Sequence, residues 1–508
     1  MATTAMKRTS LLCICVLLFG QLVTPILAQD AGTVDKQMQA LRDALASDKD
    51  KKDSGPKYSQ KDIDKMQELG QRPEVKKIID DMYNDMRQAH QEQAYSLNTT
   101  TGRNGMYPNP MLQEYVNQLG QSLVPADTSN LYTFRILYDP RPESYALSTG
   151  TVYVTTGMLS SLENEAQLAY VLGHEVAHVE HNHFYEEVRG NILESALAID
   201  KEKSANKKSA IFGAIAGAAG AAVGGALGGA EGALNLGMTA AVAGFAGYAF
   251  VHAFSPKPKP TEWETVKERD ADEYALTKAL EKNYDIREAP KLLVALEQAI
   301  TRDPRAGFGF HGSKTNIVTR KEHLQSILDG TLKEELQKKA QSALIGSSPN
   351  FSLLMAALKR DNGILAMDYD LFDTARGNLE QAEAIRSSDP LTEYYLGKVY
   401  RLTSRTAEDR EKAESRMLQA IRYDAERGFY PDPHLELALT MIRENDSKLY
   451  PDIQKELKTY VQLYQRNNGG ALPENMNIIY DYLSMSGESS WMAPRVVNVS
   501  APISSGQK

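Results

Sequence analysis

Residues 174 to 178 read His-Glu-Val-Ala-His, and this spacing constrains the fold because a helix is needed to bring the two histidines together. Side chains at positions i and i+4 share one helix face, so both imidazoles reach one Zn²⁺ while Glu175 reaches a water beside it. The motif predicts a hydrolytic site. The alternative, a buried structural helix, would leave the charge of Glu175 without a partner, which is costly.

The residues before the motif indicate the elements that carry it. Apolar residues at helical spacing, with Gly173 as the only strong breaker, predict a helix over 162–185. Residues 150–157 alternate with β-branched side chains and predict a strand that leads into this helix. A helix over 112–123 and a strand over 132–138 come earlier. We therefore expect an α+β fold, with a mostly helical peptidase domain that contains a small sheet.

Length and charge limit the classes of protein. The chain has 508 residues, of which 42% are hydrophobic, enough for two or three domains with real cores. Its formal net charge is -9, without a basic stripe, which argues against nucleic acid as a partner.

The N-terminus predicts export. Residues 1–28 have two early basic residues, a strongly apolar run and a plausible cleavage position after Ala28, as in a signal peptide. Cys13 and Cys15, the only cysteines, lie inside it, so the mature chain would have no disulfides. The alternative is an uncleaved anchor; both readings place the rest outside the cytoplasm, in the periplasm or at a membrane. Residues 29–75 are polar and read as a segment with a solvated linker.

A Gly/Ala-rich apolar insert occupies 209–255. Over 209–254 its glycines recur mostly every four residues, which lets helices approach closely and suggests a membrane hairpin or a tight helical pair. Glycine and alanine supply little hydrophobicity, and lysines flank both ends. We therefore favour a buried or membrane-touching hairpin over a double span, and expect any membrane contact here.

The C-terminal part, 336–508, is predicted to be an all-α domain with a weak repeat. The triplet Ala-Ile-Arg occurs at 384–386 and again at 420–422, 36 residues later. Residues 396–400 match the Leu-Gly-x-x-Tyr core of a tetratricopeptide repeat, and Asp389-Pro390 falls where such a repeat turns. Such repeats form concave surfaces for partners, although an ordinary helical cap is an equally good interpretation.

A catalytic zinc needs a third protein ligand. A metzincin would have its third histidine where Phe184 stands, so that class is excluded. His181 and His183 could reach the same metal only if the helix ended sharply, and we interpret them as surface groups or outer partners. Glu268 and Asp272 lie four apart on a second predicted helix, so the glutamate could bind the metal while the aspartate orients a histidine.

Together these residues resemble a known family of zinc peptidases, which includes the CAAX prenyl protease, the heat-shock protease HtpX and BepA-like periplasmic proteases. In that family His-Glu-x-x-His is completed by Glu-x-x-x-Asp, matched here by His174, Glu175, His178, Glu268 and Asp272. The resemblance covers about 132–328, within an expected peptidase domain at 76–335. The order of signal peptide, peptidase and helical repeats extends it to nearly the whole chain.

The resemblance implies further site residues. An edge strand before the motif corresponds to Tyr145, Ala146 and Leu147, which would pair with an extended substrate. A loop near the zinc usually carries His-Pro and then Arg; this chain has His311-Gly312 and, later, Arg320. Either side chain could donate to the oxyanion, or His311 could cover the metal, or both could lie in a polar surface loop.

The expected function is that of a zinc-dependent endopeptidase, with one Zn²⁺ per chain, acting on misfolded or misassembled envelope proteins in extended or unfolded form. Glu175 would take a proton from the attacking water and pass it to the leaving amine. Two other classes stay open. The chain could be a chaperone-like assembly factor that contacts envelope assembly machinery through its repeats, or an interaction protein with a structural metal centre.

Overall fold

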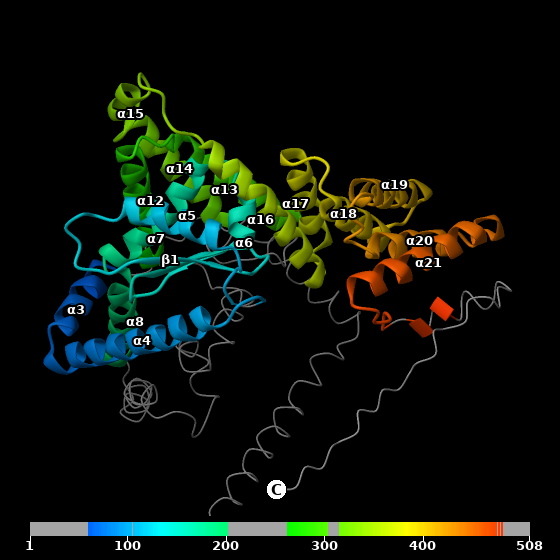
Figure 1. Ribbon diagram of the computed structural model, residues 1–508. Coiled ribbons are helices and arrows are strands. Elements are labelled where there is room, and N and C mark those ends of the chain that lie inside the picture. Colours follow the sequence, from blue (N-terminus) through cyan, green and yellow to red (C-terminus); the bar gives the residue numbers. More distant parts are fainter. Residues whose placement is uncertain are drawn as a thin grey trace, which may run out of the picture.

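The computed structural model describes residues 59–103, 105–201, 262–302, 314–474, 476–477 and 479–480. A helical body containing a small sheet leads into an arm of helices (Figure 1). The α+β class is confirmed. The predicted signal peptide, the Gly/Ala insert and His311 lie outside the described residues.

The sheet of the body has three strands. They are β1 (Thr133–Leu137), β2 (Ser144–Ala146) and β3 (Thr151–Thr155), in the order β1-β3-β2. β1 runs parallel to β3, and β2 runs antiparallel to it, with Tyr145 opposite Tyr153. β1 and β3 are the two strands expected at 132–138 and 150–157, and β2 lies at an edge of the sheet.

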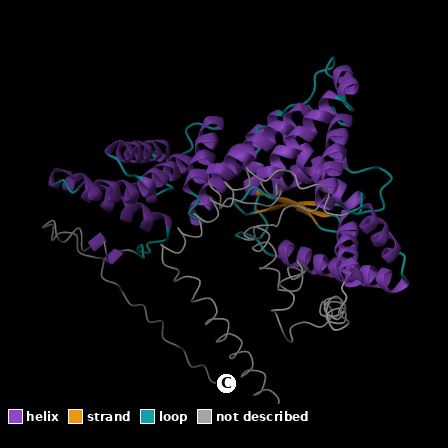
Figure 2. Ribbon diagram, turned by 180° about the vertical axis from the view of Figure 1, so that it is seen from behind, coloured by secondary structure: helices purple, strands orange, loops and turns teal. Residues whose placement is uncertain are grey.

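Helices cover both faces of this sheet (Figure 2). One face packs into the main core with α5 (Pro110–Leu123), α6 (Thr156–Ser161) and α7 (Glu165–Glu180). The other face contacts α4 (Pro73–Thr99) through the cluster that contains Leu147. Because the sheet is covered on both faces, β3 is buried along its whole length, as its continuous apolar and β-branched sequence requires.

The N-terminal helices differ from the expected polar linker. Residues 60–70 form α3 (Gln60–Gly70), which begins with a capping box in which Ser59 and Asp62 exchange hydrogen bonds. Its Met66 and Leu69 pack with residues of α8 (His183–Lys201) in a separate small core. The few apolar residues of this polar segment thus pack α3 against α8.

The body continues past the expected boundary at 335. Its remaining elements are α12 (Glu262–Glu281), η2 (Ile286–Glu288), α13 (Ala289–Arg302), α14 (Lys314–Asp329), α15 (Lys333–Lys339) and α16 (Pro349–Asp368). Phe351, Met355 and Leu358 of α16 belong to the main core. The first helix after 340 therefore closes the body.

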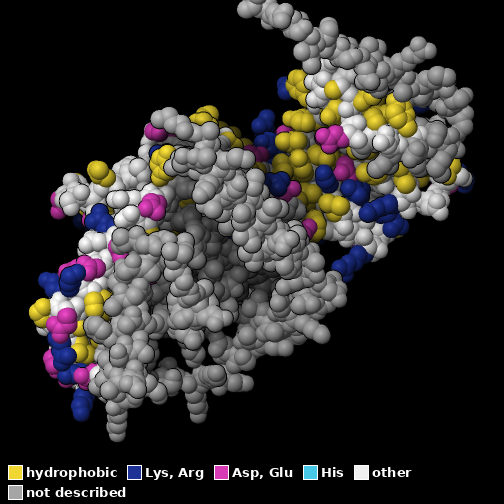
Figure 3. Space-filling model, turned by 90° about the horizontal axis from the view of Figure 1, so that it is seen from below, with side chains coloured by type: hydrophobic (Ala, Val, Ile, Leu, Met, Phe, Trp, Pro, Cys, Tyr) yellow, Lys and Arg dark blue, Asp and Glu magenta, His cyan; other side chains and the backbone are white. Residues whose placement is uncertain are grey.

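The arm consists of α17 (Phe372–Ile385), α18 (Pro390–Thr403), α19 (Ala407–Asp424), α20 (Asp432–Glu444), η4 (Ser447–Leu449) and α21 (Tyr450–Asn467). Helices α18 and α19 pack closely, since a Cβ at Gly397 would lie 2.7 Å from Cε of Met417. Asp389 caps α18 at the expected turn. The tetratricopeptide assignment stays a prediction. Figure 3 shows hydrophobic side chains gathered on the arm. The large hydrophobic residues of the arm that are exposed include Leu402, Leu418 and Phe429.

A buried lysine ties the arm to the body. Nζ of Lys359, on α16, donates to the carbonyl oxygens of Ser160 and Leu162 at 2.5 and 3.2 Å, and to Oε1 of Gln381 on α17 at 2.7 Å. Burial lowers the pKa of Lys359 to about 8. No helix within the described ranges is long and apolar enough to cross a membrane.

We expect His90 to make stability depend on pH. This histidine of α4 accepts the backbone N–H of Ser148, in the turn between β2 and β3, at Nδ1 (3.1 Å). Burial lowers its pKa from 6.5 to about 4. The folded state therefore favours the neutral ring, and its contribution is complete above pH 6.5 and lost as the pH falls towards 4. Between pH 7 and 5 the loss is about 2 kcal/mol.

The matched variant is His90→Asn, whose side-chain oxygen can accept the same N–H but does not titrate. Thermal unfolding followed by circular dichroism at pH 7 and pH 5 should show a larger destabilisation on acidification for the wild type than for the variant. An equal loss in both proteins would contradict this role.

Candidate metal centre

Helix α7 carries the His-Glu-Val-Ala-His motif and is shorter than expected. It starts at Glu165, where the Asn164 side chain accepts the N–H of Gln167, and it ends at Glu180. Asn182 has φ 58°, a left-handed conformation that asparagine tolerates and that stops the helix. The expected helix over 162–185 is therefore two helices, α7 and the start of α8, with a turn at residues 181–182 between them.

Three side chains converge on one point, and we call them the primary cluster: His174, His178 and Glu268. The two Nε2 atoms face each other at 3.1 Å. Oε2 of Glu268 lies 3.4 Å from Nε2 of His174, and its Oε1 lies 3.7 Å from Nε2 of His178. All three ligand atoms fall within 4.8 Å of one another, as donors for one metal ion would.

A glycine allows the two helices to come this close. Gly173, directly before the motif, faces Ala275 on α12, and a Cβ there would lie only 3.2 Å from the Cα of Ala275. The small residues on both helices therefore permit the close approach that brings Glu268 to the histidines. Gly173, which the sequence marked as a helix breaker, therefore allows the contact between α7 and α12.

The pKa values show that the two histidines compete for a proton. Burial and Arg320 lower the pKa of His174, but the carboxylates of Asp272 and Glu268 raise it to about 9. Burial and the neighbouring His174 lower the pKa of His178 to about 3. A divalent cation placed between the two facing nitrogens can bind the lone pairs of both rings and so removes this competition. Two imidazoles and a carboxylate form a donor set that suits Zn²⁺.

Asp272 orients His174. Its Oδ1 lies 2.9 Å from Nδ1 of His174 and accepts the hydroxyl of Tyr170 at 2.7 Å. A proton on Nδ1 that is donated to this carboxylate leaves Nε2 free to bind a metal. The roles expected for the i, i+4 pair on α12 thus agree with the geometry, although ligation itself stays a prediction. Tyr170 was missed, despite its place one turn before His174.

Arg320 differs from its expected position. It lies on α14 rather than in a polar surface loop, and it is only 4% exposed. Its Nε and Nη2 donate to the two oxygens of Asp272 at 3.0 and 2.6 Å, and Nη1 lies 3.4 Å from Oε2 of Glu268. The guanidinium therefore holds the carboxylates around His174, because burial demands that its charge be paired. A role towards an oxyanion stays a prediction.

Glu175 points from α7 towards the edge of the sheet. The hydroxyl of Ser144, on β2, donates to its Oε1 at 2.7 Å. Burial raises the pKa of Glu175. Of the expected edge strand, Tyr145 and Ala146 lie in β2 and Leu147 follows directly; Tyr145 is partly exposed. Ser144 was not expected to hold Glu175, because no local pattern relates positions 31 residues apart.

The turn after α7 brings a third histidine back to the motif. Nδ1 of His183 lies 3.0 Å from Nδ1 of His178, and Nε2 of His183 lies 3.0 Å from Oδ2 of Asp270. His181 contacts the same aspartate oxygen through Nδ1. The sharp end of the helix is real, but it directs His183 to the outer nitrogen of His178. The interpretation of His183 as an outer partner agrees with this geometry.

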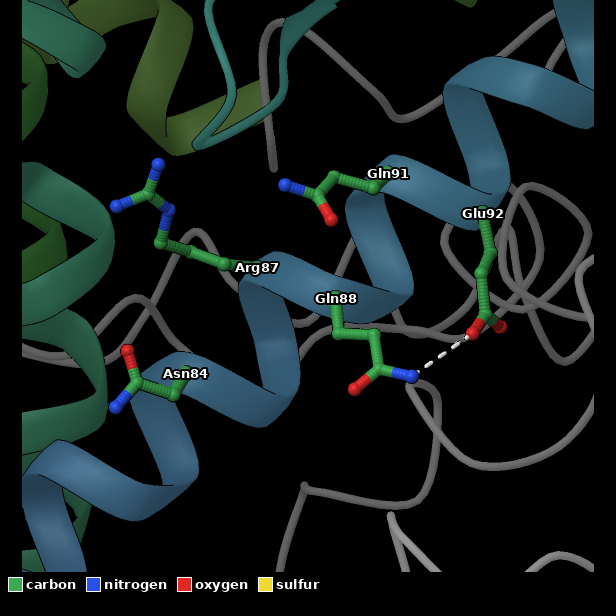
Figure 4. Close-up of a pocket in the computed structure, with 5 residues that line it drawn as sticks. All are labelled: Asn84, Arg87, Gln88, Gln91 and Glu92. Carbon is green, nitrogen blue, oxygen red and sulfur yellow. Dashed lines mark hydrogen bonds between the residues drawn. The ribbon is translucent and has the colours of Figure 1, made fainter.

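A polar hollow elsewhere on the body has no such donors. Figure 4 shows Asn84, Arg87, Gln88, Gln91 and Glu92 along α4, with Nε2 of Gln88 donating to Oε1 of Glu92 at 3.2 Å. The lining residues include no histidine and only one carboxylate. The candidate metal-binding side chains therefore lie on α7 and α12 and not in this hollow.

Fold and site have the features of a metallopeptidase: the fold is mainly helical with a small sheet, and the candidate donor groups come from two packed helices. Residues 108–358 match the sequence model of Peptidase family M48, which is a family of zinc metallopeptidases. This stretch of the chain is therefore similar to a peptidase family M48 domain, and it extends into the first half of α16, whose Phe351, Met355 and Leu358 belong to the main core.

Three proteins named as beta-barrel assembly-enhancing proteases are similar to parts of the chain. The Vibrio cholerae protein is 25% identical over 190 residues, the Yersinia pestis protein 32% over 78, and the Escherichia coli K12 protein 29% over 91. The matches cover 37%, 15% and 18% of this chain and 33%, 16% and 19% of those proteins. The chain thus matches a third or less of their length.

We expect Asp272→Asn to weaken divalent-metal binding. The amide can still accept from His174, but it lacks the charge that orients and polarises the ring and that pairs with Arg320. Loss of such an outer partner typically costs about 10–100-fold in metal affinity. Zinc affinity of the metal-free protein, measured by competition with a chelator, gives the change. Tyr170→Phe, which removes the hydrogen bond to Asp272 and the one from Arg320 but keeps the charge of Asp272, should change the affinity much less; equal effects would contradict the assignment.

Proposed function

We propose that the protein is a zinc-dependent endopeptidase acting on misfolded or misassembled envelope proteins. The observation that carries the proposal is the convergence of His174, His178 and Glu268 within 4.8 Å, beside the buried Glu175, inside a peptidase family M48 domain. A structural metal centre has no use for a buried general base, so the geometry favours catalysis.

The three residues of the primary cluster would hold the zinc. When bound, zinc supplies Lewis acidity, which makes water acidic near neutral pH and polarises a peptide carbonyl. Asp272 keeps the His174 ring in the tautomer that binds a metal, and Arg320 balances the charge of Asp272 and Glu268.

Glu175 would move the protons. It lies one residue after His174, on the helix that also presents His178, so its carboxylate can reach a water next to the cluster. The hydroxyl of Ser144 holds one carboxylate oxygen at 2.7 Å and leaves the other for the water. Burial raises the pKa of Glu175, which strengthens it as a base. The proton then passes from Glu175 to the leaving amine.

The substrate would lie along β2. This strand is at the edge of the sheet, so its outer backbone groups can pair with an extended peptide. Ser144 begins the strand and contacts Glu175, so a peptide paired with β2 runs past the general base. Backbone pairing selects extended chains with little regard to sequence, as removal of unfolded proteins requires.

The cellular setting follows from the relatives and from the N-terminus. The relatives of this domain are named for beta-barrel assembly in bacteria, and residues 1–28 read as a signal peptide. We therefore place the protein in the periplasm, where it can associate with a membrane. Its clients would be envelope proteins that fail to fold or assemble.

A second function is favoured by the arm. Its paired helices, from α17 to α21, expose hydrophobic side chains such as Leu402 and Phe429. We propose that this surface holds envelope proteins or their assembly machinery, in the manner of a chaperone-like assembly factor, with proteolysis as a secondary activity.

We expect Glu175→Gln to keep zinc and to abolish proteolysis. The amide preserves the size of the side chain and the contact with Ser144, but it cannot take a proton, and general-base loss typically costs about 10²–10⁴-fold. Cleavage of an unfolded envelope protein and zinc content are measured on the same preparation. Glu180→Gln, on the same helix but held by Thr128 and Tyr132, is the matched control and should retain activity.

Two outcomes distinguish the peptidase from the assembly factor. Full cleavage by Glu175→Gln would contradict the peptidase mechanism. Rescue of a deletion phenotype by the same variant would favour the assembly factor, since only proteolysis is removed. Crosslinking clients to Glu175→Gln in the native envelope then identifies what the protein acts on.

A further inference from the structure

A second group of metal-ligating side chains lies next to the primary cluster. We call His181, His183 and Asp270 the accessory cluster. We propose that it binds a second divalent transition metal, such as Zn²⁺, and that its occupation weakens metal binding by the primary cluster.

The geometry of the accessory cluster suits a metal. The ligand atoms of His181, His183 and Asp270 all lie within 4.8 Å of one another. His181 lies in the turn after α7, His183 begins α8, and Asp270 lies on α12. Two imidazoles with one carboxylate favour zinc, nickel or copper over magnesium or calcium, which prefer oxygen ligands.

The accessory cluster is also open to solvent. His181 and Asp270 have side chains that are 36% and 47% exposed, whereas that of His183 is 9% exposed. Water can therefore complete the coordination of a bound ion, and an ion can enter without a change of fold. Within the part of the chain that the structure describes, the ion pairs of the Asp270 carboxylate are with the two histidines of the accessory cluster.

The hydrogen bond between His178 and His183 couples the two clusters. Their Nδ1 atoms are 3.0 Å apart, so one of them must carry a proton and the other must accept it. A metal on Nε2 of His178 requires the proton on Nδ1 of that ring. His183 then accepts at Nδ1, carries its own proton on Nε2 and donates it to Asp270.

A metal on the accessory cluster requires the opposite arrangement. Nε2 of His183 must lose its proton to bind the ion, so the proton of that neutral ring moves to Nδ1. If both clusters were filled, two N–H groups would face each other across 3.0 Å. Either the hydrogen bond breaks or one metal binds less tightly. The coupling is reciprocal, so each ion lowers the affinity for the other.

The coupling between the two clusters rests on the proposed function, whereas metal binding by the accessory cluster does not. The test is calorimetric titration of the metal-free full-length protein with Zn²⁺. The wild type should take up two ions, the second with lower affinity. His181→Ala should remove the second event and keep the first, because His181 is outside the primary cluster. His323→Ala, which removes a nearby surface histidine, should keep both.

The coupling is tested with His174→Ala, which disables the primary cluster and leaves the accessory cluster intact. In this variant the affinity of the accessory cluster for Zn²⁺ should be about tenfold or more higher than the affinity of the wild type for its second ion. Loss of a hydrogen bond to a metal-ligating histidine typically changes metal affinity by about this factor. Asp270→Asn in this background should abolish that event, with folding checked by circular dichroism.

The outcomes separate the claims. A single event in the wild type, or a second event that survives His181→Ala, overturns the accessory site. An unchanged affinity in His174→Ala overturns the coupling. If Glu175→Gln remains proteolytic while two zinc ions still bind as described, the proposed catalytic mechanism fails and the accessory site stands.

Discussion

The structure depends on a buried ion pair between α12 and α14. Asp272 is fully buried and Arg320 is 4% exposed, so their charges are tolerable only because each is hydrogen-bonded. The same carboxylate receives Tyr170 and faces His174 on α7. One aspartate thus joins three helices and sets the orientation of the ring of His174, a candidate metal ligand. Stability of the body and chemistry of the site rest on the same contacts.

A small sheet completes the site. β2 is only three residues long, yet it places Ser144 against Glu175 and forms one edge of the described sheet. The proposed general base is therefore held by the element along which we propose that a substrate lies. The sheet is rigid because α4 covers its other face, and His90 links that helix to the turn after β2. Helix α4 and strand β2, which are far apart in the sequence, thus help to hold the carboxylate of Glu175 in place.

Histidine chemistry extends the site outwards. His174 and His178 each have an outer partner, which is an aspartate for the first and His183 for the second. The second arrangement differs from the first because a histidine has a single proton to place. An aspartate only accepts, whereas His183 can change which nitrogen carries its proton. The accessory cluster therefore communicates with the primary cluster, and this is the basis of the coupling we propose.

Local patterns determined much of this protein. Alternation and helical spacing located β1, β3 and α5, and the four-residue spacings located both pairs on α7 and α12, since period and side-chain direction are properties of the backbone alone. Tertiary structure decided the rest. It ended α7 at a left-handed Asn182, docked α3, buried Arg320 and brought Ser144 to Glu175. These outcomes depend on contacts between residues far apart in the chain. Burial requires every charge and polar group to have a partner, and a local sequence pattern does not show which distant residue that partner is.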